Sequence, residues 1–266
     1  MKKIFSLFML IVLTISLTSC INNITYDELL LQYQQDIEAR QEIYDSYIEM
    51  YDVLSTQTIK SIVKVSNTVQ SPSKTAVGSG FIFYEDDTLL YVLTNHHVID
   101  LNGGSLQTIT VTDYLGKNRT GTIVAADESY DLAVVSFSKT GANLDVLQFS
   151  QQNLKFMDRV IVMGYPDGQI NGISLGEFIE FDEVEIISST YTSLINFPVL
   201  TIDAPVESGS SGSVVLNKNY EIAGIIYAGR FKDGSSTSDF AYAVAVTHIK
   251  EFLELYEVVF NNEVSS

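Results

Sequence analysis

The sequence predicts an all-β domain with a helix at each end. After residue 57, short runs rich in Val, Ile, Thr, Phe and Tyr alternate with turn residues, which is typical of a β-sandwich or β-barrel. Strands are expected over 59–65, 78–84, 89–94, 108–113, 121–126, 132–136, 159–163, 173–181, 184–189, 199–203, 213–216, 221–227 and 239–246. We expect a crossing between two β units over 141–153, and a short amphipathic helix over 246–256.

Residues 25–54 predict a long amphipathic helix that precedes the strands. Thr25 and Glu28 have the spacing of a capping box, and apolar residues then recur every three or four positions with no Gly or Pro between them. Two roles are open for this helix. It either packs on the domain that follows, or it forms a stalk or oligomerisation segment, so that a homo-oligomer through residues 25–54 is possible.

Composition and charge narrow the class of protein. The 266 residues are 46% hydrophobic and carry a formal net charge of −18, as in an acidic globular protein. Nucleic acid is not an expected partner, because its phosphates need Lys and Arg to neutralise them. Because the protein is strongly acidic, a basic patch is not expected to attach it to anionic lipids. The single cysteine excludes an intramolecular disulfide.

The first twenty residues predict export. Lys2 and Lys3 precede an apolar run over 4–17, which is the plan of a secretory signal and is short for a membrane span. The segment Leu17-Thr18-Ser19-Cys20 resembles a bacterial lipoprotein signal. This resemblance implies removal of residues 1–19, lipid on Cys20, and attachment to the extracytoplasmic face of the cell membrane. The alternative is an ordinary signal peptide or membrane anchor with an incidental cysteine.

Three segments carry residues suited to nucleophilic catalysis. They are Leu93–Ile99 with two histidines, Ser129–Val135 with an aspartate, and Asp203–Ser213 with several serines between glycines. A serine hydroxyl needs a base to take its proton, and a histidine oriented by a buried carboxylate supplies one. Glycines beside a serine let backbone N–H groups converge on one point, where an oxyanion can bind. The chain order His, Asp, Ser is that of chymotrypsin.

At these segments the chain resembles chymotrypsin-fold serine peptidases of the bacterial HtrA and staphylococcal glutamyl-endopeptidase type. The resemblance rests on five segments in the same order, Thr94–Val98, Asp131–Val134, Met163–Pro166, Gly209–Ser213 and Ile222–Ile225, and spans about residues 57–258. It implies two six-stranded antiparallel β-barrels, over 57–145 and 146–258, with the final helix in the second, and a tail over 259–266. A PDZ domain is not expected, because the chain ends about ten residues after the last predicted helix.

The same resemblance assigns the catalytic roles. It implies His97 as the base, Asp131 as its carboxylate and Ser211 as the nucleophile, in preference to His96, Asp127 and the neighbouring serines. Gly209, Ser210 and Ser211 would form the oxyanion hole, with the backbone N–H groups of Gly209 and Ser211 as donors. Ser210 replaces the usual Asn or Asp, and Val214 replaces the common Pro, so the loop departs from the family pattern.

The expected specificity pocket carries no charge. It comprises Ser208, Ile225, Ile226, Tyr227 and Ala228, which favour a small or medium apolar residue before the cleaved bond. Arg230, just beyond, is the main contrary sign. No cofactor or metal ion is expected. The sequence thus predicts a serine endopeptidase that acts on exported or extracellular polypeptides. The alternative is a catalytically inactive, protease-like surface lipoprotein that serves as a binding or adhesion module.

Overall fold

The computed structural model describes residues 25–71, 73–101, 106–170, 172–186, 193–231 and 235–258. The chain divides into two compact units, one that ends at Asp52 and one that begins at Val53. The predicted signal peptide, Cys20 and the tail 259–266 lie outside the described residues. No helix among the described residues has both the length and the apolar character needed to cross a membrane.

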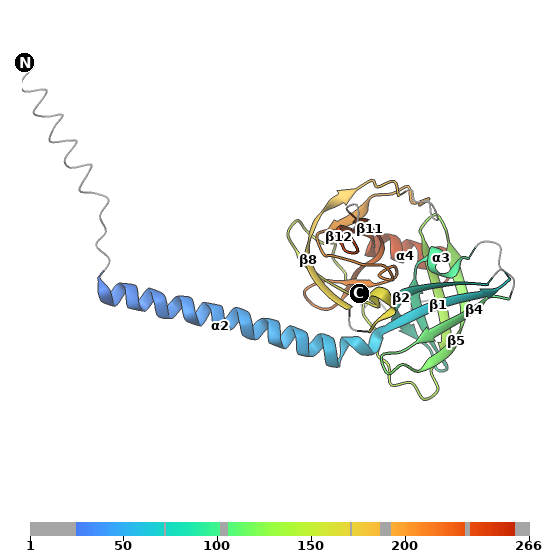
Figure 1. Cartoon of the computed structure of the whole chain (residues 1–266), viewed down its shortest axis with the longest axis horizontal. Helices are drawn as coiled ribbons and strands as arrows, with labels where there is room; N and C mark the ends of the chain where they lie inside the picture. Colours follow the sequence, from blue (N-terminus) through green and yellow to red (C-terminus); the bar gives the residue numbers. More distant parts are fainter. Residues whose placement is uncertain are drawn as a thin grey trace, which may run out of the picture. The chain divides into compact units, whose positions relative to one another are not determined.

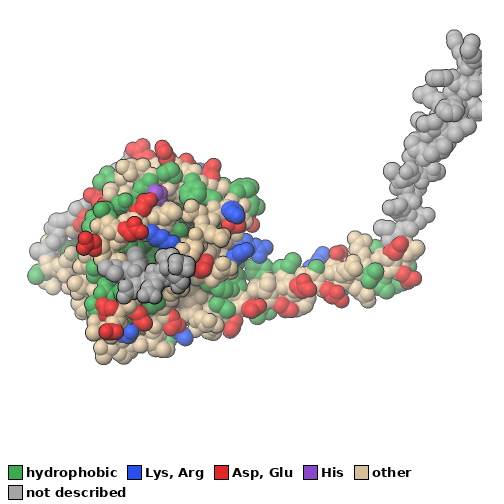
Figure 2. Space-filling model, turned by 180° about the vertical axis from the view of Figure 1, so that it is seen from behind, with side chains coloured by type: hydrophobic (Ala, Val, Ile, Leu, Met, Phe, Trp, Pro, Cys, Tyr) green, Lys and Arg blue, Asp and Glu red, His purple; other side chains and the backbone are tan. Residues whose placement is uncertain are grey.

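Helix α2 (Tyr26–Thr56) forms most of the first unit and confirms the helix predicted over 25–54. Its start is a complete capping box, because the Thr25 N–H donates to Glu28 Oε2 at 2.8 Å and the Glu28 N–H donates to Thr25 Oγ1 at 3.3 Å. At 1.5 Å per residue the helix is about 46 Å long. Figure 2 shows acidic and apolar side chains along this helix.

The first barrel of the second unit is a closed antiparallel sheet in the order β1-β2-β3-β6-β5-β4 (Figure 1). Its strands are β1 (Ile62–Gln70), β2 (Ser73–Glu85), β3 (Leu89–Thr94), β4 (Thr108–Thr112), β5 (Asn118–Asp127) and β6 (Leu132–Ser138). Closure occurs where β1 pairs with both β2 and β4. The core is aliphatic and includes Val65, Ile82, Val92, Val111 and Val135.

The second barrel is closed in the order β10-β11-β12-β9-β8-β7. Its strands are β7 (Arg159–Gly164), β8 (Gly172–Asp182), β9 (Val199–Ile202), β10 (Val214–Leu216), β11 (Ile222–Phe231) and β12 (Ser238–Ala245). Small residues such as Ala241 and Ala243 face larger ones such as Phe178 and Leu200 in its core. The two six-stranded antiparallel barrels confirm the predicted fold class.

The segment between the barrels is held by both of them. The Leu147 N–H donates to the carbonyl oxygen of Ile82 in the first barrel at 2.9 Å. Phe149 forms an isolated bridge with Ile222 in the second. Each barrel therefore has a fixed attachment to the connecting segment.

Helix α4 (Val246–Leu255) follows β12. It buries Val246, Ile249, Phe252 and Leu253, whose spacing places them on one helical face.

Two strand predictions are wrong in part. The run expected as a strand from residue 59 begins as a 3₁₀ helix, η1 (Thr58–Ser61), and only then enters β1. Val184 to Ile186, expected to begin a strand, lie in an irregular segment after β8, and residues 187–189 fall outside the described residues. Both runs are rich in β-branched residues, whose strand preference depends on available pairing partners.

Candidate active site

His97 and Asp131 lie together at one end of the first barrel. His97 is in the short helix α3 (His96–Ile99), directly after β3, and Asp131 is in the turn between β5 and β6. His97 Nδ1 lies 2.8 Å from Asp131 Oδ2, and the His97 backbone N–H donates to Asp131 Oδ1 at 3.0 Å. Asp131 is 1% exposed and the His97 side chain is 22% exposed. One carboxylate oxygen therefore holds the imidazole, and the other holds the backbone of the same residue.

The backbone around Asp131 is shaped for this contact. Asp131 has φ 50°, a left-handed conformation that is uncommon outside glycine and that surrounding contacts must hold in place. The side-chain amide of buried Asn95 donates to the Asp131 carbonyl oxygen at 3.0 Å. Asp127, the competing carboxylate, accepts the Ser129 N–H at 2.8 Å and the Tyr256 hydroxyl at 2.9 Å. Asp127 therefore stabilises its own turn through Ser129 and contacts the end of α4 through Tyr256.

Ser211 lies in a tight loop before β10 in the second barrel. Gly209 and Gly212 have φ 83° and 88°, which glycine adopts without strain. The N–H groups of Ser210, Gly212 and Ser213 each donate to a backbone carbonyl. Within the described chain, the N–H groups of Gly209 and Ser211 have no acceptor. The loop thus leaves free the two donors that the sequence predicted for an oxyanion hole.

Ser79 in β2 connects this loop to the first barrel, and sequence reasoning missed it. Its backbone N–H donates to the Ser211 carbonyl oxygen at 2.7 Å, and its own carbonyl accepts the Thr94 hydroxyl at 2.7 Å. Its hydroxyl donates to the Gly209 carbonyl oxygen at 2.8 Å and accepts the Tyr165 N–H at 2.8 Å. The only sequence signal was the pair of glycines that flank it, Gly78 and Gly80.

Gly78 marks how closely the two halves of the site approach. A Cβ on Gly78 would lie 2.6 Å from Val98 Cγ2 and 2.9 Å from the Ser211 carbonyl oxygen. Val98 follows His97 in the chain, so the turn carrying the histidine and the loop carrying Ser211 both contact this glycine. The structure therefore brings His97, Asp131 and Ser211 to the junction between the barrels.

The predicted pocket residues differ in exposure. Ile225, Ile226 and Tyr227 are buried, Ala228 is half-buried, and Ser208 is exposed. Ile226 packs in the core of the second barrel. Burial, and next the charge of Asp131, raise the pKa of Tyr227, so its hydroxyl stays protonated at neutral pH. The strand β11 therefore presents few polar side-chain groups beside the loop.

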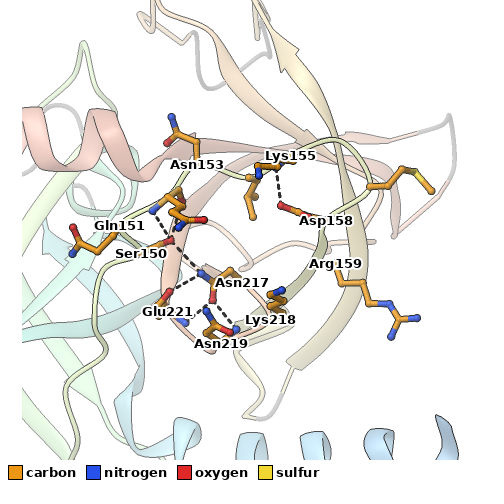
Figure 3. Close-up of a pocket in the computed structure, with 13 residues that line it drawn as sticks. Ser150, Gln151, Asn153, Lys155, Asp158, Arg159, Asn217, Lys218, Asn219 and Glu221 are labelled. Atoms are coloured by element: carbon orange, nitrogen blue, oxygen red, sulfur yellow. Dashed lines mark hydrogen bonds between the residues drawn. The ribbon is translucent and has the colours of Figure 1, made fainter.

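A hollow of about 410 Å³ lies elsewhere on the second barrel. Figure 3 shows that it is lined by the segment from Ser150 to Arg159 and by the turn from Asn217 to Glu221. None of its lining residues belongs to the predicted catalytic or pocket sets. Asn217 links its two walls by donating to Ser150 Oγ at 3.2 Å and Glu221 Oε2 at 2.8 Å. Across the described chain, no group of three His, Cys, Asp or Glu residues could hold a metal ion.

The sequence matches a known protein family. The profile of the trypsin-like peptidase domain matches residues 78–225, which include His97, Asp131 and Ser211. The chain belongs to this trypsin-like peptidase family. The family match agrees with the chymotrypsin-like resemblance of the sequence.

Relatives of this trypsin-like chain include HtrA-like serine proteases. One from Staphylococcus aureus is 26% identical over 193 residues, covering 65% of this chain and 24% of the relative. One from Staphylococcus epidermidis is 23% identical over 224 residues, covering 77% and 36%. The chain therefore spans about a quarter to a third of the length of these curated relatives.

Solved structures show the same fold. The active form of the Rv3671c protease from M. tuberculosis has a TM-score of 0.64 at 23% identity, covering 77% of this chain and 84% of that one. The serine endoprotease from Yersinia pestis has a TM-score of 0.59 at 24% identity, covering 74% and 63%. At these identities the likeness concerns the fold.

Proposed function

We propose that the protein is a serine endopeptidase with Ser211 as nucleophile, His97 as general base and Asp131 as the carboxylate that orients it. The observation that carries this proposal is the double contact of Asp131 with His97, through Nδ1 at 2.8 Å and the backbone N–H at 3.0 Å. With its Nδ1 held by the carboxylate, the imidazole can present Nε2 to a serine hydroxyl.

The proposed reaction follows the chemistry of these groups. Ser211 Oγ attacks the carbonyl carbon of a peptide bond as His97 Nε2 takes its proton. The oxyanion is stabilised by the free N–H groups of Gly209 and Ser211. His97 then gives the proton to the leaving amine, and an acyl group stays on Ser211. A water molecule, deprotonated by His97, hydrolyses that ester and restores the enzyme.

The pocket supports a preference for a small or medium apolar residue before the cleaved bond. Its named side chains carry no formal charge, and Gly229, which follows them, has Val206 close by, because a Cβ on this glycine would meet Val206 Cγ2 at 2.9 Å. A charged side chain would lose hydration there without gaining a partner. A peptide-library profile should be dominated by Val, Ala or Leu, and a profile dominated by Glu or Arg would refute this preference.

A serine-directed fluorophosphonate tests the catalytic proposal. Wild-type protein should be labelled and should hydrolyse unfolded casein, whereas Ser211→Ala should do neither. Ser138→Ala removes an exposed hydroxyl from the first barrel and should behave as wild type. Absence of labelling in folded wild-type protein at any pH would instead favour the inactive, protease-like binding module.

We also propose that lipid on Cys20 holds the enzyme on the extracytoplasmic face of the membrane. The support is the sequence alone, in which the single cysteine follows Leu17-Thr18-Ser19 directly after an apolar run. Cys20→Ser should move the protein from the membrane fraction to the soluble fraction. Retention of the variant in the membrane fraction would exclude lipid at Cys20 as the anchor.

Self-association through α2 is the third part of the proposal. Positions separated alternately by four and three residues form one stripe, as in a coiled coil, with Arg40 the only charged member. They are Tyr26, Leu30, Tyr33, Ile37, Arg40, Tyr44, Tyr47 and Tyr51, which are all exposed, whereas the next position, Leu54, is buried. Six of the helix's eight acidic residues lie on the opposite face, where a bundle of copies leaves them in water. That acidic face disfavours an anionic membrane surface as the partner of the stripe.

A further inference from the structure

Within the described residues, the edge of β11 that faces the Ser211 loop has no strand paired to it over its second half. Strand β10 pairs with β11 only from Ile222 to Ile225, whereas β12 pairs with β11 as far as Phe231. Just before the free stretch, the Ile226 N–H donates to Ser213 O at 2.9 Å and the Gly212 N–H donates to Ile226 O at 2.8 Å. The free edge therefore begins beside Ser211 and can accept a peptide as an added strand.

Arg230 lies on this free stretch. It pairs with Phe240 and Ala228 pairs with Tyr242 on β12, so Ala228 and Arg230 lie on the same face of the sheet, about 7 Å apart along the strand. The Arg230 guanidinium carbon lies 4.8 Å from the centre of the Phe240 ring, which restricts the orientation of the side chain. Within the described residues this guanidinium contacts no carboxylate. The Phe240 contact therefore positions a guanidinium that can donate to an anion.

We propose that Arg230 is a specificity-determining residue that selects an acidic side chain within four residues of the cleaved bond. Guanidinium groups bind carboxylates through paired N–H donors, and the stacked geometry lowers the conformational cost of forming such a pair. The chain has four arginines against 33 acidic residues, so few arginines are available to bind an anion, and this one lies on the strand beside the Ser211 loop without a carboxylate contact among the described residues. This proposal rests on the proposed peptidase function, because that function places the substrate along β11.

Matched peptides test this selection. One cleaved sequence is varied at each of the four positions on either side of the bond, with Asp in one series and Asn in the other. For wild-type protein, kcat/KM should favour Asp over Asn at one position by about 3–10-fold, the size of a partly exposed ion pair with good geometry. Arg230→Gln should bring the ratio at that position to about one, and Arg230→Glu should reverse it.

Arg159→Gln supplies the control, because it removes the same charge from the hollow of Figure 3 and should leave the Asp/Asn ratio unchanged. Equal loss in both variants would show general attraction by charge and would overturn the proposal, as would a ratio near one at every position. Dissociation constants of the same peptides for Ser211→Ala give a second readout that needs no turnover. A protein that hydrolyses nothing yet binds the Asp peptide more tightly through Arg230 would refute the peptidase function alone.

Discussion

The Ser79 hydroxyl donates to the Gly209 carbonyl oxygen at 2.8 Å, across 130 residues of sequence and between the two barrels. Ser79 Oγ also accepts the Tyr165 N–H, and Ser213 Oγ donates to it at 3.1 Å. One side chain of the first barrel therefore fixes the Gly209–Ser210 peptide plane, which adjoins the plane that carries the Gly209 N–H, a proposed oxyanion donor. The nucleophile loop depends on this inter-barrel contact for its shape.

Replacing Ser79 with Ala should lower kcat by about 10–100-fold, because a misplaced donor stabilises the oxyanion less well. The loss of kcat on complete removal of one donor is the upper limit. It also leaves the buried Tyr165 N–H without its acceptor, which should cost about 1–3 kcal/mol of unfolding free energy. Steady-state kinetics and urea denaturation measure the two effects. Ser213→Ala removes only the 3.1 Å neighbour and should cost less in both; an equal loss of kcat in the two variants would contradict this role of Ser79.

Asp131→Asn should reduce kcat by about 10⁴-fold, because an amide cannot hold the imidazole in the required tautomer or stabilise its protonated form. The amide still has an oxygen for the His97 backbone N–H, so the fold should persist. Circular dichroism and kinetics on the same preparation separate a loss of catalysis from a loss of fold. Asp127→Asn is the matched control and should retain most activity; a comparable loss in that variant would argue against the assignment of Asp131.

Two glycines in left-handed conformation should respond very differently to alanine. Gly212→Ala forces a Cβ to within 1.9 Å of the Ser79 carbonyl oxygen at φ 88°, so the loop must distort and both stability and labelling by fluorophosphonate should fall. Gly116→Ala, at φ 78° with no atom within 4 Å of the added Cβ, should cost only about 1 kcal/mol. Thermal unfolding distinguishes them, and similar melting temperatures would contradict the close packing at Gly212.

Stability should fall as pH drops from about 4 to about 2. The backbone N–H groups of Thr88 and Leu89, with the Tyr91 hydroxyl, lower the Asp86 pKa from 3.8 to about 2. A lowered folded-state pKa means that the stabilisation is present above the unfolded-state pKa and disappears as the folded carboxylate is protonated. Denaturant titrations between pH 2 and pH 5 should show a shallower fall for Asp86→Asn than for wild type, with Asp87→Asn as the neighbouring control. Identical slopes would show that Asp86 does not contribute to the loss of stability at low pH.

The proposed α2 stripe predicts which substitutions dissociate the oligomer. Ile37→Glu places a charge within the stripe and should lower the molar mass measured by light scattering at a given concentration. Ala39→Glu adds the same charge off the stripe and should leave the mass of wild type. A monomeric wild-type protein, or equal effects of the two variants, would exclude self-association through this helix and favour its packing on the domain that follows.

Local patterns predicted most of the strands, because each is a short run whose alternation reflects pairing in a barrel. The run 89–94 matches β3 at both ends, since Asp86 closes the preceding turn through its own side chain and His97 follows in a helix. The start of β1 and the segment after β8 were mispredicted, because among the described residues the β-branched side chains there do not lie in a paired strand. Ser79 was not found, since its partners Gly209 and Tyr165 are remote in sequence and come together only when both barrels close.

The candidate site divides between the barrels, and that division governs when the chain can first act during its synthesis. His97 and Asp131 are translated early, whereas the barrel beneath Ser211 closes only when β12 pairs with β9 and β11. The proposed nucleophile can therefore meet its proposed base only after β12 has left the ribosome. A chain that stops before β12 should lack the proposed peptidase activity, so the fold delays that activity until both barrels can close.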